Sequence, residues 1–197
     1  MTPAEPKRMA KHLLIAESVT PDHERLTLTL EQGQHVVRVR NEVLMSSRVS
    51  GSEETLASLA LAERAPESVS RVLVGGLGMG FTLRAVLGQI GPAAKVVVSE
   101  LLQPIVDWNR GPLGSYAGQP LGDPRVEILI GDVIAHLTTV KQAYDAIVLD
   151  IDNGPEAFTV AANNRLYTPS GLTTLYAALR SGGDRHACVE RSLAPSA

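Results

Sequence analysis

Residues 71–80 have the sequence RVLVGGLGMG, in which a short apolar run passes at once into glycines at positions 76, 78 and 80. The apolar run is typical of a buried strand, and the glycines allow the main chain to turn tightly and to approach a ligand closely. Three more apolar runs follow, at residues 95–98, 126–130 and 146–149, with helical stretches between them. Short apolar strands that alternate with helices predict a doubly wound, mostly parallel α/β sheet.

The first 50 residues have a different pattern, typical of antiparallel strands. Residues 26–30 alternate leucine with threonine, and residues 36–40 form a second β-like segment. Between them, residues 31–34 are typical of a hairpin turn, because Gly33 can take a positive φ. The sequence therefore predicts a flexible tail over residues 1–12, a small N-terminal antiparallel β domain over residues 13–50 and a Rossmann-like domain over residues 51–197.

The C-terminal part of the predicted sheet is short. Thr168 before Pro169 is typical of a helix start. After Gly183, residues 184–190 are polar, where a further strand and a final hairpin usually complete a sheet of this type. We therefore expect the sheet to end one or two strands early, or a partner chain, as in a homodimer, to cover the exposed edge.

The composition predicts a soluble, cytoplasmic protein. The net charge is −3 and the basic residues are scattered, which argues against a nucleic-acid or anionic-membrane surface. No apolar run approaches the roughly 20 residues needed to span a bilayer, and the first 12 residues lack the apolar core of a signal peptide. The single cysteine, Cys188, excludes an internal disulfide framework, and the five histidines lack metal-binding spacing, so we expect no metal site.

Acidic residues stand where the predicted strands end, which is the edge at which open parallel sheets bind ligands. Glu100 ends the second strand, and its carboxylate can accept two hydrogen bonds from ribose hydroxyls. Asp132 follows the third strand and can accept from an adenine amino group, while the neighbouring amide, of Val133, donates to the ring. Asp150 ends the fourth, wholly apolar strand; burying a charge there is costly, so it is the catalytic candidate. The alternative for each acid is structural: a solvated side chain, a turn or a loop cap.

The glycine loop also bears on the choice of nucleotide. A strand-to-helix turn with glycines is a weak signal alone. The dinucleotide fingerprint G-x-G-x-x-G, counted from Gly76, needs a glycine at the position of Phe81. An NAD-dependent oxidoreductase is therefore the weakest of the alternatives.

Several segments together resemble spermidine synthases. Residues 72–84, VLVGGLGMGFTLR, are similar to the family's V-L-I-I-G-G-G-D-G-G-T-L-R, and residues 144–150, YDAIVLD, to its Y-D-V-I-I-x-D. The family's D-P-R-V…G-D is matched between residues 123 and 132, and its closing L-Y…L-R-P-G-G between residues 166 and 183. The likeness extends over residues 13–183 and implies a class I methyltransferase-type fold.

The resemblance implies a nucleoside-binding catalytic domain and a role for each candidate. The cofactor would be S-adenosylmethionine, its decarboxylated form or methylthioadenosine. Asp150 would deprotonate an attacking amine. The adenosyl group would be held by Gly76, Gly78, Gly80, Glu100, Asp132 and Val133.

The chain departs from the family where polyamines are recognised. Met79 replaces the acid that meets the donor's aminopropyl ammonium, and Asn153 replaces a second acid, for which Asp152 can substitute. Glu53 and Glu54 stand where the family has Y-H-E or Y-Q-E, and these four polar residues are the substrate-binding candidates. We therefore expect methyl transfer from S-adenosylmethionine to a small amine-type acceptor. Aminopropyl transfer from the decarboxylated donor is the first alternative, and a non-catalytic nucleoside-binding protein the second.

Overall fold

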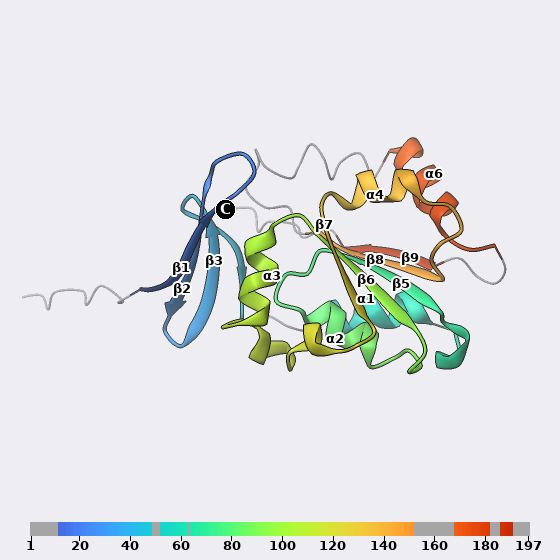
Figure 1. The fold of residues 1–197 in the computed structure, drawn as a ribbon, viewed down its shortest axis with the longest axis horizontal. Helices are drawn as coiled ribbons and strands as arrows, with labels where there is room; N and C mark the ends of the chain where they lie inside the picture. The colour runs from blue at the N-terminus through green and yellow to red at the C-terminus, as the bar shows by residue number, and fades with distance from the viewer. Residues whose placement is uncertain (1–11, 49–51, 63, 152–167, 182–185, 191–197) are drawn as a thin grey trace, which may run out of the picture.

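The computed structural model describes residues 12–48, 52–62, 64–151, 168–181 and 186–190, which form two sheets and the helices around them (Figure 1). The first sheet is antiparallel, with strand order β1-β2-β3-β4. Its strands are β1 (Leu13–Val19), β2 (Arg25–Glu31), β3 (Gln34–Val39) and β4 (Glu42–Ser46).

The predicted hairpin is confirmed at the turn between β2 and β3. The two strands pair from Leu26 opposite Val39 to Glu31 opposite Gln34, which leaves Gln32 and Gly33 as the two turn residues. Both have positive φ, 50° and 82°. A two-residue turn of this kind matches the twist of the flanking strands, which explains why a glycine is found here.

The second sheet is parallel throughout and has the order β7-β6-β5-β8-β9. The predicted apolar runs form four of its strands: β5 (Arg71–Gly75), β6 (Lys95–Glu100), β7 (Val126–Ile130) and β8 (Ala146–Asp150). β5 lies at the centre, so the chain winds outward first in one direction and then in the other. This order confirms the predicted doubly wound α/β architecture.

The fifth strand corrects one expectation from the sequence. Residues 184–190 were expected to be too polar to continue the sheet, but β9 (His186–Glu190) pairs along the whole of β8, from Ala146 to Asp150. The three central residues of β9, Ala187 to Val189, are apolar, and this short run is enough to continue the sheet beside β8.

Helices cover both faces of the parallel sheet (Figure 1). One side carries α1 (Ser52–Leu61) and α2 (Phe81–Leu87), and the other carries α4 (Val133–Thr139) and α6 (Pro169–Ala178). The N-terminus of α6 confirms the helix start predicted at Thr168, whose side chain accepts a hydrogen bond from the amide of Gly171. The other helical segments are α3 (Gln103–Arg110) and the short 3-10 turns η1 (Pro66–Ser68), η2 (Gly114–Ala117) and η3 (Pro120–Gly122).

Two apolar clusters form the core, because alternate residues of a strand point to opposite faces of the sheet. Leu73 and Ile147 belong to the cluster under α4 and α6. Val72 and Val74 belong to the other cluster, which also contains Leu26 and Leu28 of β2. The antiparallel sheet therefore shares one of the two clusters with the parallel sheet.

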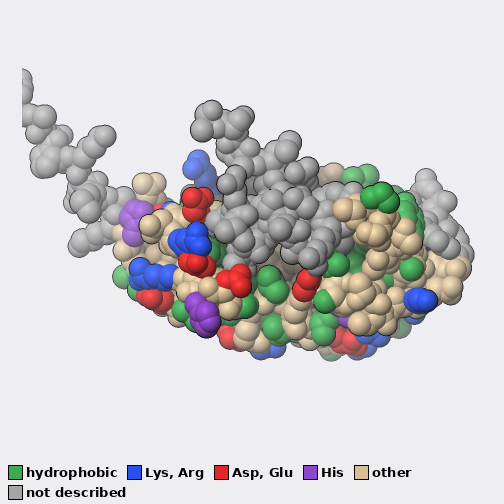
Figure 2. Space-filling model, turned by 90° about the horizontal axis from the view of Figure 1, so that it is seen from above, with side chains coloured by type: hydrophobic (Ala, Val, Ile, Leu, Met, Phe, Trp, Pro, Cys, Tyr) green, Lys and Arg blue, Asp and Glu red, His purple; other side chains and the backbone are tan. Residues whose placement is uncertain are grey.

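No helix in the described ranges is long and apolar enough to cross a membrane. Positively and negatively charged side chains lie intermixed on the face shown in Figure 2.

Candidate functional site

The glycine loop, residues 76–80, crosses the carboxyl end of the parallel sheet. The amide of Gly76 donates to the carbonyl oxygen of Ser99 (2.8 Å), which ties the loop to β6. The three glycines have φ values of 87°, 51° and 85°. A Cβ at position 76 would lie 2.1 Å from the carbonyl oxygen of Asp150, so the loop passes directly over the end of β8. Glycine at this position is therefore required both by φ and by space.

Glu100 is buried beneath this loop, with 7% of its surface exposed. Its two carboxylate oxygens accept hydrogen bonds from the amides of Leu77 and Leu102, both at 2.9 Å. Burial raises the pKa of Glu100, and the hydrogen bonds from neighbouring amides oppose that rise. The amides of Gly78 and Leu101 also donate to this carboxylate, so a ribose hydroxyl would share acceptor positions with main-chain amides.

Asp132 and Val133 lie where β7 passes into α4. Asp132 is the N-cap of α4, and one carboxylate oxygen accepts from the amide of Ile134 (2.8 Å). The structural alternative is thus present, in the form of a helix cap. The side chain is exposed at the sheet edge, so capping leaves it accessible to a ligand. Val133 is buried, and its side chain packs beside Gly75 at the end of β5.

Asp150, the catalytic candidate, is the last residue of β8 and is half-buried. Its Oδ2 accepts a hydrogen bond of 2.5 Å from the hydroxyl of Thr82, a side chain of α2 that is 1% exposed. The acid is therefore attached to the helix that follows the glycine loop. Sequence reasoning missed this contact, although Thr82 stands inside the quoted motif.

Two apolar side chains at the same edge were also missed. Leu101 directly follows β6 and is 38% exposed, while Ile130 ends β7 and is 44% exposed. Ile130 is the strand partner of Glu100, and Leu101 is the next residue in the chain. Both apolar side chains therefore belong to residues next to Glu100 at the sheet edge. Large exposed apolar groups next to polar ones are typical of a ligand site.

Of the four substrate-binding candidates, the structure describes Glu53 and Glu54. Glu54 forms an exposed ion pair with Arg84 of α2 (3.0 Å), and Glu53 is half-buried on α1. Asp152 and Asn153 lie outside the described residues. Within the described ranges, no three His, Cys, Asp or Glu side chains are grouped so that they could hold a metal ion.

Met79 is buried, with 6% of its surface exposed, and belongs to the apolar cluster that also contains Leu77 and Phe81. These three side chains occupy the positions between and after the glycines. The loop thus carries only apolar side chains among its non-glycine residues, and it offers no charge of its own to a cationic ligand.

Comparison with known proteins identifies one family. Residues 50–190 match the family model described as the spermine/spermidine synthase domain. A polyamine aminopropyltransferase of Korarchaeum cryptofilum is 30% identical over 117 residues, which is 59% of this chain and 34% of that relative. Polyamine aminopropyltransferase 2 of Pseudomonas aeruginosa is 34% identical over 116 residues, or 57% of this chain and 31% of that protein. The matched segment thus covers only about a third of either relative.

Solved structures are similar over most of the chain. Spermidine synthase from Thermotoga maritima has a TM-score of 0.70 at 22% identity, covering 90% of this chain and 58% of that one. A spermidine synthase in complex with the transition-state analogue AdoDATO has a TM-score of 0.68 at 21% identity, covering 90% and 57%. The likeness at this identity shows the fold, and it confirms the predicted class I methyltransferase-type sheet with a preceding antiparallel β segment.

Proposed function

Because the chain belongs to the spermine/spermidine synthase family, we propose that it is a transferase that moves an aminopropyl group from decarboxylated S-adenosylmethionine to a small amine. The observation that carries the proposal is the family match over residues 50–190, which includes the glycine loop and the three strand-end acids. The sequence alone favoured methyl transfer. Aminopropyl transfer takes precedence because both relatives named above are aminopropyltransferases.

The donor's adenosyl group would lie across the ends of β5, β6 and β7. Glu100 would accept hydrogen bonds from the ribose hydroxyls, and it would share its carboxylate between them and the main-chain amides that already donate to it. Asp132 would accept from the adenine amino group, and the amide of Val133 would donate to the ring. The exposed side chains of Leu101 and Ile130 supply apolar surface for the planar base.

The proposed reaction is an in-line displacement at the carbon attached to the donor's sulfonium. The amine nitrogen attacks that carbon with its lone pair, the carbon–sulfur bond breaks, and its electrons remain on sulfur as a neutral thioether. Asp150 accepts the proton that the nitrogen gives up. Thr82 donates a hydrogen bond to Oδ2 of this carboxylate and would hold the side chain at the end of β8, where it would orient the amine.

One observation favours a second candidate, methyl transfer from S-adenosylmethionine. Met79 is buried in an apolar cluster where the family has an acid for the donor's ammonium. A thioether is a weak acceptor and cannot supply a full charge to that cation. A donor whose terminal ammonium is accompanied by a carboxylate would depend less on an acid at this position.

Parallel calorimetry with S-adenosylmethionine, its decarboxylated form, methylthioadenosine and NAD tests these candidates, combined with mass spectrometry of small amines after incubation. Aminopropyl transfer requires that the decarboxylated donor bind about tenfold tighter, or roughly 1.4 kcal/mol, and that an aminopropylated amine form. A methylated amine with equal donor affinities supports the second candidate. Nucleoside binding without turnover of any amine shows a non-catalytic binder, and binding of NAD alone overturns the proposal.

A further inference from the structure

Asn109 is buried in the last turn of α3, with 2% of its surface exposed. Its side-chain nitrogen donates two hydrogen bonds of 2.9 Å. One goes to the carbonyl oxygen of Ile105, one turn earlier in the same helix, and the other to the carbonyl oxygen of Gly78 in the glycine loop. Asn109 therefore joins the loop to α3 by a contact that its own helix does not need.

The side-chain oxygen of Asn109, Oδ1, accepts no hydrogen bond from any described residue, although it is buried. A buried acceptor without a partner lowers stability, because it loses its bonds to water and gains none. Packing and stability alone thus do not explain an asparagine at this position.

Asn109 also contacts the end of the loop. A Cβ at Gly80 would lie 3.3 Å from Oδ1 of Asn109, 3.3 Å from the side chain of Ala117 and 3.1 Å from that of Pro120. Gly80 is therefore enclosed by α3, η2 and η3. The loop turn itself closes with a hydrogen bond from the amide of Gly80 to the carbonyl oxygen of Leu77 (2.8 Å).

Two elements thus hold the loop. Gly76 and Leu77 are held from β6, through the carbonyl of Ser99 and the carboxylate of Glu100, to which the amide of Gly78 also donates. The carbonyl of Gly78 is held from α3 by Asn109, and Gly80 packs against the same side chain. Glycines have the greatest conformational freedom of all residues, so a loop with three of them gains most from such restraints.

We propose that Asn109 is a positioning residue for the donor site: it fixes residues 78–80 in the conformation that receives the adenosyl group before any ligand binds. The identity of the ligand rests on the proposed function, whereas the restraint on the loop does not. A loop that is ordered in advance loses less conformational freedom on binding, so the donor binds more tightly.

Asn109→Ser separates the two hydrogen bonds. Its shorter hydroxyl can still donate to Ile105 in the same helix, as serine does in helices, but it falls short of Gly78. Asn109→Ala is a second variant with the same expectation for the loop. Leu137→Ala is the matched control, because Leu137 is equally buried but belongs to the cluster on the opposite face of the sheet.

Native-state amide hydrogen exchange measures the restraint directly, since the amide of Gly80 is hydrogen-bonded within the restrained segment and should be protected. In Asn109→Ser this amide should exchange about tenfold faster through local opening, and in Leu137→Ala only as much as global stability falls. The amide of Leu77, which Glu100 holds, should change less and is the internal reference. Rates in Asn109→Ser that rise no more than in the control overturn the proposal.

Titration with methylthioadenosine tests the consequence for the ligand. Asn109→Ser should bind it about tenfold more weakly, and the KM of the donor should rise while the KM of the amine stays constant. If amide exchange shows that the loop of Asn109→Ser opens more often, but its affinity for methylthioadenosine is unchanged, the positioning role is overturned. A wild-type protein that binds no adenosyl nucleoside overturns the proposed function, and the exchange rates then decide on the loop restraint alone.

Discussion

The main chain of Gly76 lies against the carbonyl group of Asp150 so closely that a single added carbon would come within 2.1 Å of the oxygen. The carboxylate of Asp150 also accepts a hydrogen bond from the hydroxyl of Thr82, which lies two residues after the end of the loop. The glycine loop and the catalytic candidate are thus held together at two points, one in the main chain and one in the side chain.

Gly76→Ala should lower the free energy of unfolding by about 2–4 kcal/mol, because its Cβ meets backbone at an unfavourable φ. Gly78→Ala is the matched control: it also has a positive φ, but nothing lies within 4 Å of its Cβ. That variant should cost only about 1 kcal/mol. Urea unfolding of both proteins checks the difference, and equal losses would contradict the close contact with Asp150.

Asp150→Asn should reduce turnover by about 10²–10⁴-fold while donor affinity stays nearly unchanged, because the amide keeps the shape of the side chain but cannot take a proton. Steady-state kinetics and donor calorimetry give the two quantities. Asp132→Asn is the control just after the end of β7, which is separated from β8 by β5 and β6; in this variant affinity rather than turnover should fall. If Asp150→Asn retains turnover and loses thermal stability, Asp150 is structural.

Glu100→Ala should weaken donor binding by about 1–3 kcal/mol, the scale of hydrogen bonds to a charged group. The structure adds a cost in stability, because the amides of Leu77 and Leu102 lose their acceptors. Glu100→Gln keeps one acceptor oxygen and should fall between the wild type and the alanine variant. Calorimetry with methylthioadenosine and urea unfolding measure both effects; unchanged donor affinity in Glu100→Ala would remove Glu100 from the ribose site.

Met79→Asp should lower the free energy of unfolding by about 1–3 kcal/mol, because it places a polar group among buried apolar side chains. Met79→Leu, which nearly preserves volume, should cost less than about 1.5 kcal/mol. Urea unfolding distinguishes the two variants. If Met79→Asp instead keeps its stability and gains affinity for the decarboxylated donor, position 79 faces the donor rather than the core.

Stability should fall as the pH drops below about 6.5, the ordinary histidine pKa. Burial lowers the pKa of His35, and burial followed by the charge of Arg71 lowers the pKa of His136. The unfolded chain therefore takes up protons before the folded one does, so acid favours unfolding. A double His35→Gln, His136→Gln variant should show a shallower decline between about pH 7 and pH 5.5 in urea unfolding. Identical slopes in the two proteins would contradict this assignment.

The sequence predicted the parts of the fold that depend on local patterns. The apolar runs that became β5 to β8, the turn at Gln32 and Gly33, and the helix start at Thr168 all carry their signal within a few residues. The doubly wound order followed because such strands, joined by helices, have few ways to assemble. β9 was missed because its apolar run, Ala187 to Val189, is only three residues long and is flanked by polar residues, whereas its pairing depends on the main chain of β8.

The site was predicted less completely, for a physical reason. Strand-end acids could be found by position, but their partners come from elements distant in the chain. Thr82 meets Asp150 only because α2 returns over β8, and Asn109 meets Gly78 only because α3 lies beside the loop. Contacts of this kind have no periodic signal in a single sequence.

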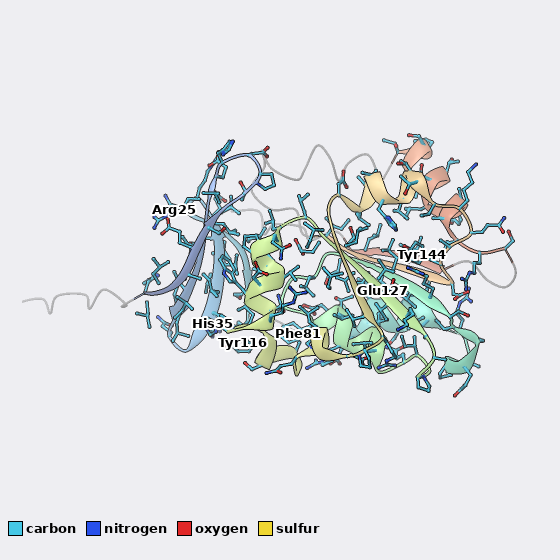
Figure 3. All side chains as sticks on the ribbon, in the orientation of Figure 1. Arg25, His35, Phe81, Tyr116, Glu127 and Tyr144 are labelled. Atoms are coloured by element: carbon cyan, nitrogen blue, oxygen red, sulfur yellow. The ribbon has the colours of Figure 1, made fainter. Side chains whose placement is uncertain are left out.

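His35 of β3 shares a hydrogen bond of 2.9 Å with the hydroxyl of Tyr116 in η2, and their rings meet edge to face; the two residues lie side by side in Figure 3. Leu26 and Leu28 of the same sheet lie in one apolar cluster with Val72 and Val74. A fragment that begins near residue 50 would therefore lack apolar partners that the complete chain supplies to the parallel sheet. Its parallel sheet would expose the apolar surface that β2 and β3 cover in the intact chain, and we expect the two fragments to be stable only when they associate.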